Sequence, residues 1–222
     1  AFHLAEVMVE IGRQMERETV AVISDMDEPP GLAIGNSLEV EEAIEVLQGR
    51  IKGRLRELSI IIGSHMLRLA GRAGTVEEAA GLLDCLLESG AALEKFGEMI
   101  EAQGGNRAVV ENTSLLPQAR YRRTLTCAED GYLVVADAYL LGLAAMVLGA
   151  GRETKDSVID LSAGIKLHGR TGDKMKKGQQ FLTLFYNDKD RYIQAENLVC
   201  RAVKISREPV PPRPLVYGIV GR

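Results

Sequence analysis

The stretch Met26–Glu45, MDEPPGLAIGNSLEVEEAIE, marks the point at which the chain passes from a short apolar run to a long helical tract. The run before it, TVAVISDM from Thr19, is rich in β-branched residues and is typical of a buried parallel strand. After it, residues 38–103 carry apolar side chains at helical spacing. A strand, a loop rich in Pro and Gly and then a helix predict an α/β fold, with several helices packed on a sheet that contains residues 20–24.

The acidic start of this helix admits two interpretations. Asn36 or Ser37 can cap the helix, and Glu39 then completes a capping-box pattern with Asn36. Glu42 lies one turn further on, from where its side chain could reach back over the loop. Loop carbonyl oxygens together with this carboxylate would suit a hard cation. The simpler alternative is a Glu42 side chain that points into solvent and favours the positive end of the helix dipole.

The helical tract has clear internal breaks and one strong start signal. Thr75 followed by Glu78 forms a capping-box signature. A further helix is predicted near the beginning of the chain, over residues 3–16, because apolar residues recur there at helical spacing. Breaks are predicted at residues 49–53, 71–75 and 89–90.

The second half of the chain changes in character after residues 102–106, AQGGN. Residues 158–188 alternate short strand-like runs with turn sequences such as TGD and KKGQ. A last helix is predicted over residues 188–206, followed by an extended tail over residues 209–220. Two domains are predicted: residues 1–112, part of a central α/β domain, and residues 113–222, a smaller C-terminal α+β domain.

Composition limits the classes of function. The 222 residues are 46% hydrophobic and carry a formal net charge of −4, which leaves room for a core and argues against a generic nucleic-acid binder. No apolar run is long enough to cross a bilayer, and the acids in the first residues argue against a signal peptide. Cys85, Cys127 and Cys200 are scattered, as in reduced cytosolic proteins, so we expect a cytoplasmic protein without a membrane partner.

Two glycine-containing motifs have a functional and a structural interpretation. Residues 142–152, GLAAMVLGAGR, lack the GxxxxGK[ST] pattern of a phosphate loop, so a helix that ends at Gly149 and Gly151 is favoured. Residues 172–178, GDKMKKG, resemble the lysine-bearing hairpin of biotinyl and lipoyl domains, but a solvated basic turn is favoured.

The residues contain no recognisable catalytic constellation. His3, His65 and His168 are isolated from one another in the sequence, and there is no HExxH or GxSxG motif. No catalytic residue is therefore predicted within the chain.

The opening stretch with the run before it, AVISDMDEPPGLAIGNSLEVEEAIEVLQG, closely resembles the pyrimidine-nucleoside and thymidine phosphorylases. Their signature is approximately T/S-D-M-x-x-P-L-G-x-A-I/V-G-N-x-L-E-V-x-E-A-I. The resemblance covers essentially the whole chain, because further matches follow in family order: AQGG, LPQA, DGYLVVADA, GLAAMVLGAGRETKDSVIDLSAGIKLHGRTGDKMKKGQ and PLVY.

The resemblance implies phosphorolysis of a pyrimidine nucleoside by phosphate, in a homodimeric enzyme that closes a helical domain onto an α/β domain. It also implies a C-terminal domain similar to a biotinyl-like barrel sandwich, without a modified lysine. The chain departs from the family pattern in two ways. It matches only the later part, without the helical and phosphate-binding portion, and residues of the family pattern are skipped between Phe2 and His3.

The resemblance also implies a potassium site in the opening loop. By matching positions, its ligands here are the carbonyl oxygens of Pro30 and Ala33 and the carboxylate of Glu42. The family usually has Leu at the position of Pro30, but Pro keeps its carbonyl group and loses only the N–H. Phe2 matches a position that contacts the nucleobase. The alternatives are a non-catalytic fragment of such an enzyme and, on the basis of residues 172–178 alone, a carrier-like domain.

Overall fold

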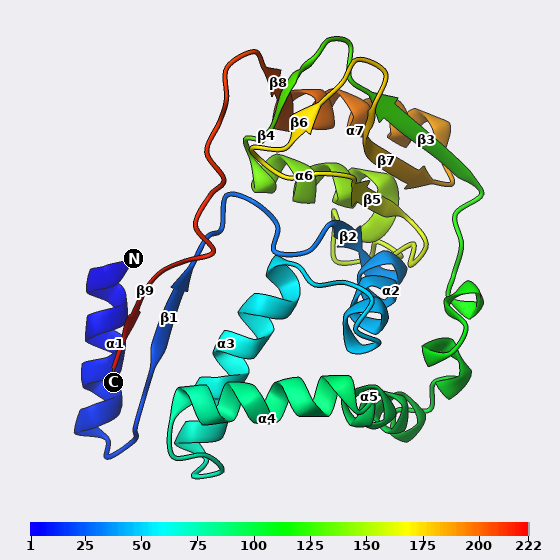
Figure 1. Cartoon of the computed structure of the whole chain (residues 1–222). Helices are drawn as coiled ribbons and strands as arrows, with labels where there is room; N and C mark the ends of the chain where they lie inside the picture. The colour runs from blue at the N-terminus through cyan, green and yellow to red at the C-terminus, as the bar shows by residue number, and fades with distance from the viewer. Residues whose placement is uncertain (222) are drawn as a thin grey trace. The chain divides into compact units, whose positions relative to one another are not determined.

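The structure, a computed structural model that describes residues 1–221, divides into two compact units (Figure 1). The first unit contains Ala1–Asp25, Glu45–Met99 and the segment that begins at Pro214. The second unit contains Met26–Ile44 and Ile100–Arg213. The opening loop therefore folds with the later half of the chain. The domain division at residues 112 and 113 stays a prediction.

The first unit is mainly helical. Its helix α4 begins as predicted, because the Thr75 hydroxyl oxygen accepts a hydrogen bond of 3.1 Å from the Glu78 N–H. Glu78 in turn accepts one of 2.8 Å from the Gly74 N–H. The predicted helices and the breaks between them are confirmed. The elements are α1 (Phe2–Gln14), β1 (Ala21–Ser24), α3 (Arg54–Leu69), α4 (Val76–Glu88), α5 (Ala91–Ala102), which passes into the second unit, and β9 (Val216–Val220).

The prediction that β1 is a parallel strand is wrong. β1 pairs antiparallel with β9, with Ala21 opposite Val220 and Ile23 opposite Gly218. The two strands lie beside α1 (Figure 1). The partner is thus the end of the segment predicted as an extended tail. A run of β-branched residues predicts a strand but carries no information on the direction of its partner.

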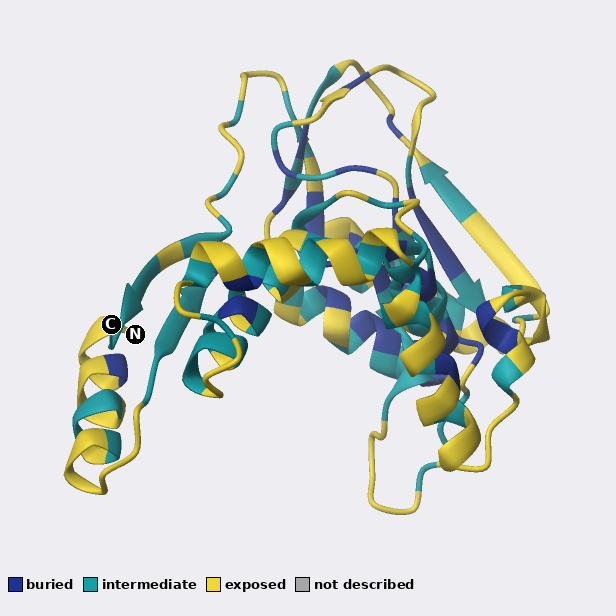
Figure 2. Ribbon diagram, turned by 60° about the horizontal axis from the view of Figure 1, so that its bottom comes forward, coloured by how far each residue is buried: buried dark blue, intermediate teal, exposed yellow. Residues whose placement is uncertain are grey.

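Helix α1 buries little of its surface. Only Ala5 is buried, and Figure 2 shows much of the helix as exposed. A stripe of large apolar side chains lies on the exposed part: Leu4, Val7, Met8, Ile11 and Met15. No helix among residues 1–221 is long and apolar enough to cross a membrane.

The second unit combines antiparallel sheets with helices. One sheet has the strand order β2-β5-β7-β3 and another the order β6-β4-β8. The elements are β2 (Ala33–Gly35), α2 (Asn36–Leu47), which passes into the first unit, β3 (Tyr121–Thr126), β4 (Gly131–Val135), α6 (Ala138–Ala145), β5 (Gly164–Leu167), β6 (Lys174–Met175), β7 (Gln180–Tyr186), α7 (Lys189–Ala202) and β8 (Val203–Ser206), with 3₁₀ turns at Arg107–Val110 and Thr113–Leu115. The mixed α/β class is confirmed, whereas the likeness to a barrel sandwich stays a prediction.

One helix boundary in this unit was predicted wrongly. The helix expected over residues 188–206 ends at Ala202, and Val203–Ser206 form β8, which pairs with β4. The reason is a change of period: Val203 and Ile205 are the apolar members of an alternating run, which suits a strand. The helical interpretation of residues 142–152 is confirmed, because α6 continues into a π-helical turn over Met146–Ala150 that is capped at Gly151. Within this turn Gly149 departs from helical geometry, with φ of +113°.

The core of the second unit lies where α6 and α7 pack against each other and against the sheet strands. Its completely buried apolar side chains come from β4, β5, β7 and both helices. They include Leu133, Leu141, Ile165, Leu182, Leu184 and Val199. This core supports β5, the strand that pairs with β2 at the end of the opening loop.

We expect Leu184→Ala to lower the free energy of unfolding by about 3 kcal/mol, because it leaves a cavity in this core. Leu161→Ala is the matched control, since Leu161 is 50% exposed, and it should cost less than about 1 kcal/mol. Urea denaturation followed by circular dichroism measures both changes. Equal destabilisation by the two substitutions would contradict the position of the core.

Candidate functional site

The Glu42 side chain folds back over the loop that precedes its helix. Its Oε1 accepts a hydrogen bond of 2.7 Å from the Leu32 N–H, and its Oε2 accepts one of 3.0 Å from the Ala33 N–H. Glu42 is only 5% exposed. The alternative of a solvated Glu42 is therefore excluded.

Gly31 makes this close approach possible. A Cβ atom at residue 31 would lie 2.3 Å from Glu42 Oε2, which is too close for any real contact. A larger residue would have to displace the carboxylate and break its bonds to the loop amides. Gly31 is thus required by space at the carboxylate, a role that the sequence pattern alone did not reveal.

The helix start is held by a second glutamate in a different way. Glu39 is exposed, and its Oε1 accepts a hydrogen bond of 2.9 Å from the Gly35 N–H. The Asn36 side chain instead donates a hydrogen bond of 2.9 Å to the Ala150 carbonyl oxygen. Glu39 therefore serves the helix start, as the capping interpretation implied, while Glu42 serves the loop.

The carbonyl side of the loop is held by Arg170, from the turn between β5 and β6. Its Nη1 donates a hydrogen bond of 2.8 Å to the Pro29 carbonyl oxygen, and its Nη2 donates one of 2.5 Å to the Pro30 carbonyl oxygen. Arg170 also pairs with Glu28 at 3.8 Å. Sequence reasoning missed Arg170, because only the residues that follow it, TGD and the basic stretch 172–178, were interpreted.

The buried charges of this loop are balanced unequally. Glu28, 2% exposed, has Arg170 as its cationic partner. Glu42 forms no ion pair with any Lys, Arg or His among residues 1–221. A buried carboxylate is costly unless it is hydrogen-bonded and its charge is compensated. The two amide donors satisfy the Glu42 oxygens but bring no compensating charge.

The remaining predicted residues lie as follows. Ala33 is buried at the start of β2, opposite Lys166 of β5. Phe2 lies in the first unit, where its ring covers Gly218 of β9. Pro30 lies before β2, Ala33 begins β2 and Glu42 lies in α2. Residues 1–221 contain no cluster of three or more His, Cys, Asp or Glu side chains that could hold a metal.

The histidines take no part in this loop. His168 Nε2 lies 2.8 Å from the Thr183 hydroxyl oxygen, which lies 2.9 Å from that of Thr124. Burial, and then the charge of Lys166, lower the pKa of His168 below its ordinary value. This chain of polar groups links β3, β5 and β7 and has a structural role.

The basic turn over residues 172–178 is built as a solvated turn. Lys174, Lys176 and Lys177 are exposed. Backbone N–H groups of the turn bind nearby side chains. The Lys177 N–H donates a hydrogen bond of 2.7 Å to the Asp130 carboxylate, and the Lys176 N–H donates one of 3.0 Å to the Gln179 side chain.

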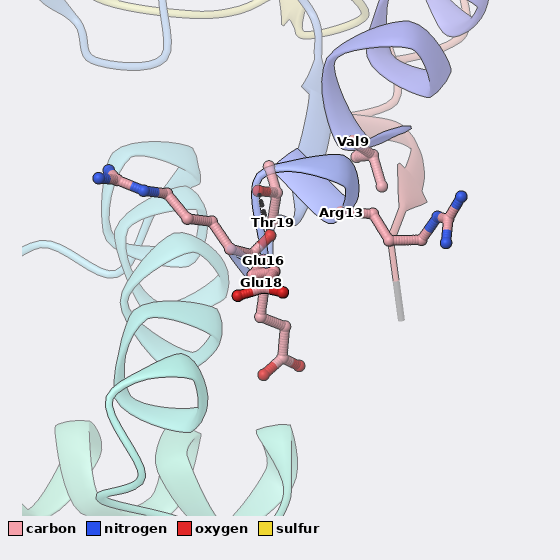
Figure 3. A pocket seen from close by; sticks show the side chains of 7 residues that line it. Val9, Arg13, Glu16, Glu18 and Thr19 are labelled. Atoms are coloured by element: carbon pink, nitrogen blue, oxygen red, sulfur yellow. Dashed lines mark hydrogen bonds between the residues drawn. The ribbon is translucent and has the colours of Figure 1, made fainter. Parts of the chain in front are cut away.

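A separate surface hollow lies in the first unit, between the end of α1 and the residues before β1 (Figure 3). Two of its charged side chains have partners. Arg13 binds Glu10, whose pKa is lowered to about 2 by hydrogen bonds from Arg13 and Gln14, and Glu18 pairs with Arg68 at 2.8 Å. The lining residues of the hollow are Val9, Arg13, Glu16, Arg17, Glu18, Thr19 and Gly221.

Known proteins resemble the chain along nearly all its length. Residues 132–206 match the family described as "Pyrimidine nucleoside phosphorylase C-terminal domain". The chain is 44% identical over 216 residues to a pyrimidine-nucleoside phosphorylase of Geobacillus stearothermophilus, a match that covers 96% of this chain and 49% of that protein. It is 47% identical over 222 residues to the protein of that name from Bacillus subtilis (strain 168), covering 99% of this chain and 50% of that protein. The chain thus spans about half the length of the curated relatives it matches. By these similarities residues 132–206 form a domain of this C-terminal family, and the chain as a whole is similar to part of the pyrimidine-nucleoside phosphorylases.

Proposed function

We propose that this chain acts as part of a pyrimidine-nucleoside phosphorylase, a pentosyltransferase. The observation that carries the proposal is the identity of 44% and 47% to proteins of that name over nearly the whole chain. In the reaction, a phosphate oxygen forms a bond to C1′ of a uridine- or thymidine-type nucleoside while the bond from C1′ to the base nitrogen breaks. The products are the free base and a (deoxy)ribose 1-phosphate, through a transition state with oxocarbenium character.

Within this proposal, the chain supplies support for the active site. Residues 1–221 show no cluster of His, Cys, Asp or Glu side chains that could hold a metal. His168 contacts Thr183, His3 is exposed, and His65 is partly buried. The groups that bind phosphate and base are proposed to come from the portion of the family to which this chain does not correspond. A non-catalytic fragment of such an enzyme is the second candidate, favoured by the coverage of 49% and 50% of the relatives.

The proposed cofactor is a potassium ion held by the Pro30 and Ala33 carbonyl oxygens and the Glu42 carboxylate. The burial of Glu42, without an ion pair among residues 1–221, supports a cation at this loop. When bound, the ion would neutralise Glu42 and connect this loop to the phosphate-binding part. The Pro30 oxygen already accepts one hydrogen bond from Arg170, which leaves one lone pair for a cation. Contact of Phe2 with the nucleobase, a homodimeric assembly and a cytoplasmic location complete the proposal.

The reaction can be tested with the chain alone and with a chimera. We expect the 222-residue chain to release no uracil from uridine and phosphate. The chimera replaces the matching half of the Bacillus subtilis relative with this chain, and it should release uracil only when phosphate is present. Chromatography of uracil measures both. Turnover by the isolated chain would refute the assignment of the substrate groups to the other portion, and a folded but silent chimera would refute the phosphorylase assignment.

The cation can be tested by thermal unfolding of the chain in potassium chloride and in choline chloride at equal ionic strength. Potassium at ten times its Kd should add about 1.4 kcal/mol of stability. Glu42→Gln should remove this gain, because a charged ligand is lost while its shape is kept. Glu39→Gln is the matched control, since Glu39 is exposed and bonds Gly35 instead. A potassium response in Glu42→Gln equal to that of the parent would eliminate Glu42 as a ligand.

A further inference from the structure

We propose that Arg170 is a positioning residue for the opening loop: its guanidinium group fixes the direction of the Pro29 and Pro30 carbonyls. The inference rests on the proposed function only where it concerns potassium, because Pro30 is one of the proposed ligands. The orientation of the loop itself stands on the contacts of Arg170.

A single guanidinium group binds two consecutive carbonyl oxygens. The distances are 2.8 Å from Nη1 to Pro29 O and 2.5 Å from Nη2 to Pro30 O. The two terminal nitrogens each bind one carbonyl oxygen, so both carbonyls face the same guanidinium group. A lysine ammonium group carries the same charge, but it lacks the rigid fork that holds two acceptors in a fixed geometry.

Both the backbone and the side chain of Arg170 are held by neighbouring residues. The Arg170 N–H donates a hydrogen bond of 2.8 Å to the Asp173 carboxylate, which holds the turn between β5 and β6. Its side chain is 21% exposed and faces Glu28, whose side chain is 1% exposed. Glu28 also accepts a hydrogen bond of 3.2 Å from the Thr171 N–H. A buried carboxylate thus compensates the guanidinium charge beside the loop.

The anchor continues into the core of the second unit. The Thr171 hydroxyl oxygen accepts a hydrogen bond of 3.0 Å from the N–H of Val135, a residue of β4 that is 1% exposed. Arg170, Thr171 and Val135 all lie within the matched residues 132–206. The C-terminal family domain therefore reaches the opening loop through Arg170 and Glu28.

Arg170 and Glu42 hold opposite groups of the same segment. Arg170 binds the carbonyls of Pro29 and Pro30, whereas Glu42 binds the amides of Leu32 and Ala33. The peptide group that carries the Pro30 carbonyl is followed directly by the one that carries the Leu32 N–H, so a rotation of the carbonyl would displace the amides that face Glu42. Arg170 thereby governs both the aim of the Pro30 oxygen and the fit of Glu42.

The test is amide hydrogen exchange of the 222-residue chain, followed by NMR in choline chloride without potassium. In Arg170→Ala and Arg170→Lys, protection of the Leu32 and Ala33 amides should fall about tenfold or more. Protection of Leu184 in the core should not change. Arg207→Ala is the matched control, because Arg207 forms an exposed pair with Glu129, and it should leave the loop amides unchanged.

Arg170→Lys keeps the positive charge but removes the fork of two donors, so it tests positioning separately from charge. It also replaces Arg170→Ala as the test variant if that substitution unfolds the chain. Loop protection equal to the parent in a folded Arg170→Lys would overturn the positioning role. A second measurement is the potassium concentration that gives half of the thermal stabilisation, which should rise about tenfold in Arg170→Lys. If the parent shows no potassium-specific stabilisation but the variants lose loop protection, the potassium proposal fails and the positioning role is supported. If the parent responds to potassium and loop protection does not change, the positioning role alone fails.

Discussion

The opening loop depends on one buried carboxylate. Glu42 offers its oxygens to the amides of Leu32 and Ala33, at the start of the edge strand β2. Leaving a buried N–H without an acceptor costs about 1–3 kcal/mol, so losing both contacts would cost a substantial part of the stability of a typical domain. The same contacts set how α2 leaves the loop, because Glu42 is part of that helix.

Two buried glutamates flank this segment, and their negative charges are compensated to different extents. Glu28 meets Arg170 and the Thr171 amide, and its charge is compensated within the chain. Glu42 meets only neutral amide donors among its hydrogen-bond partners. The charge of Glu42 is therefore left without a cationic partner among residues 1–221. The proposed potassium ion would supply this compensation.

Much of the fold follows from local rules. The helices between residues 38 and 103 could be predicted because their apolar spacing and the Thr75 cap are encoded within a few residues. The direction of β1 could not, since its partner Val216–Val220 lies at the other end of the chain. The reach of Glu42 was predictable from its position one turn into the helix. Arg170 was not, because it joins Pro30 across 140 positions, and no local pattern specifies such a contact.

The pairing of β1 with β9 has a consequence for how the protein is made. Residues Ala21–Ser24 are synthesised before the whole of the second unit, and their partner strand Val216–Val220 is synthesised only after it. The backbone donors and acceptors of β1 therefore stay unpaired while the second unit is synthesised. Completion of the first unit requires the closure of this long loop, and chaperones that bind extended segments can act on β1 during that interval.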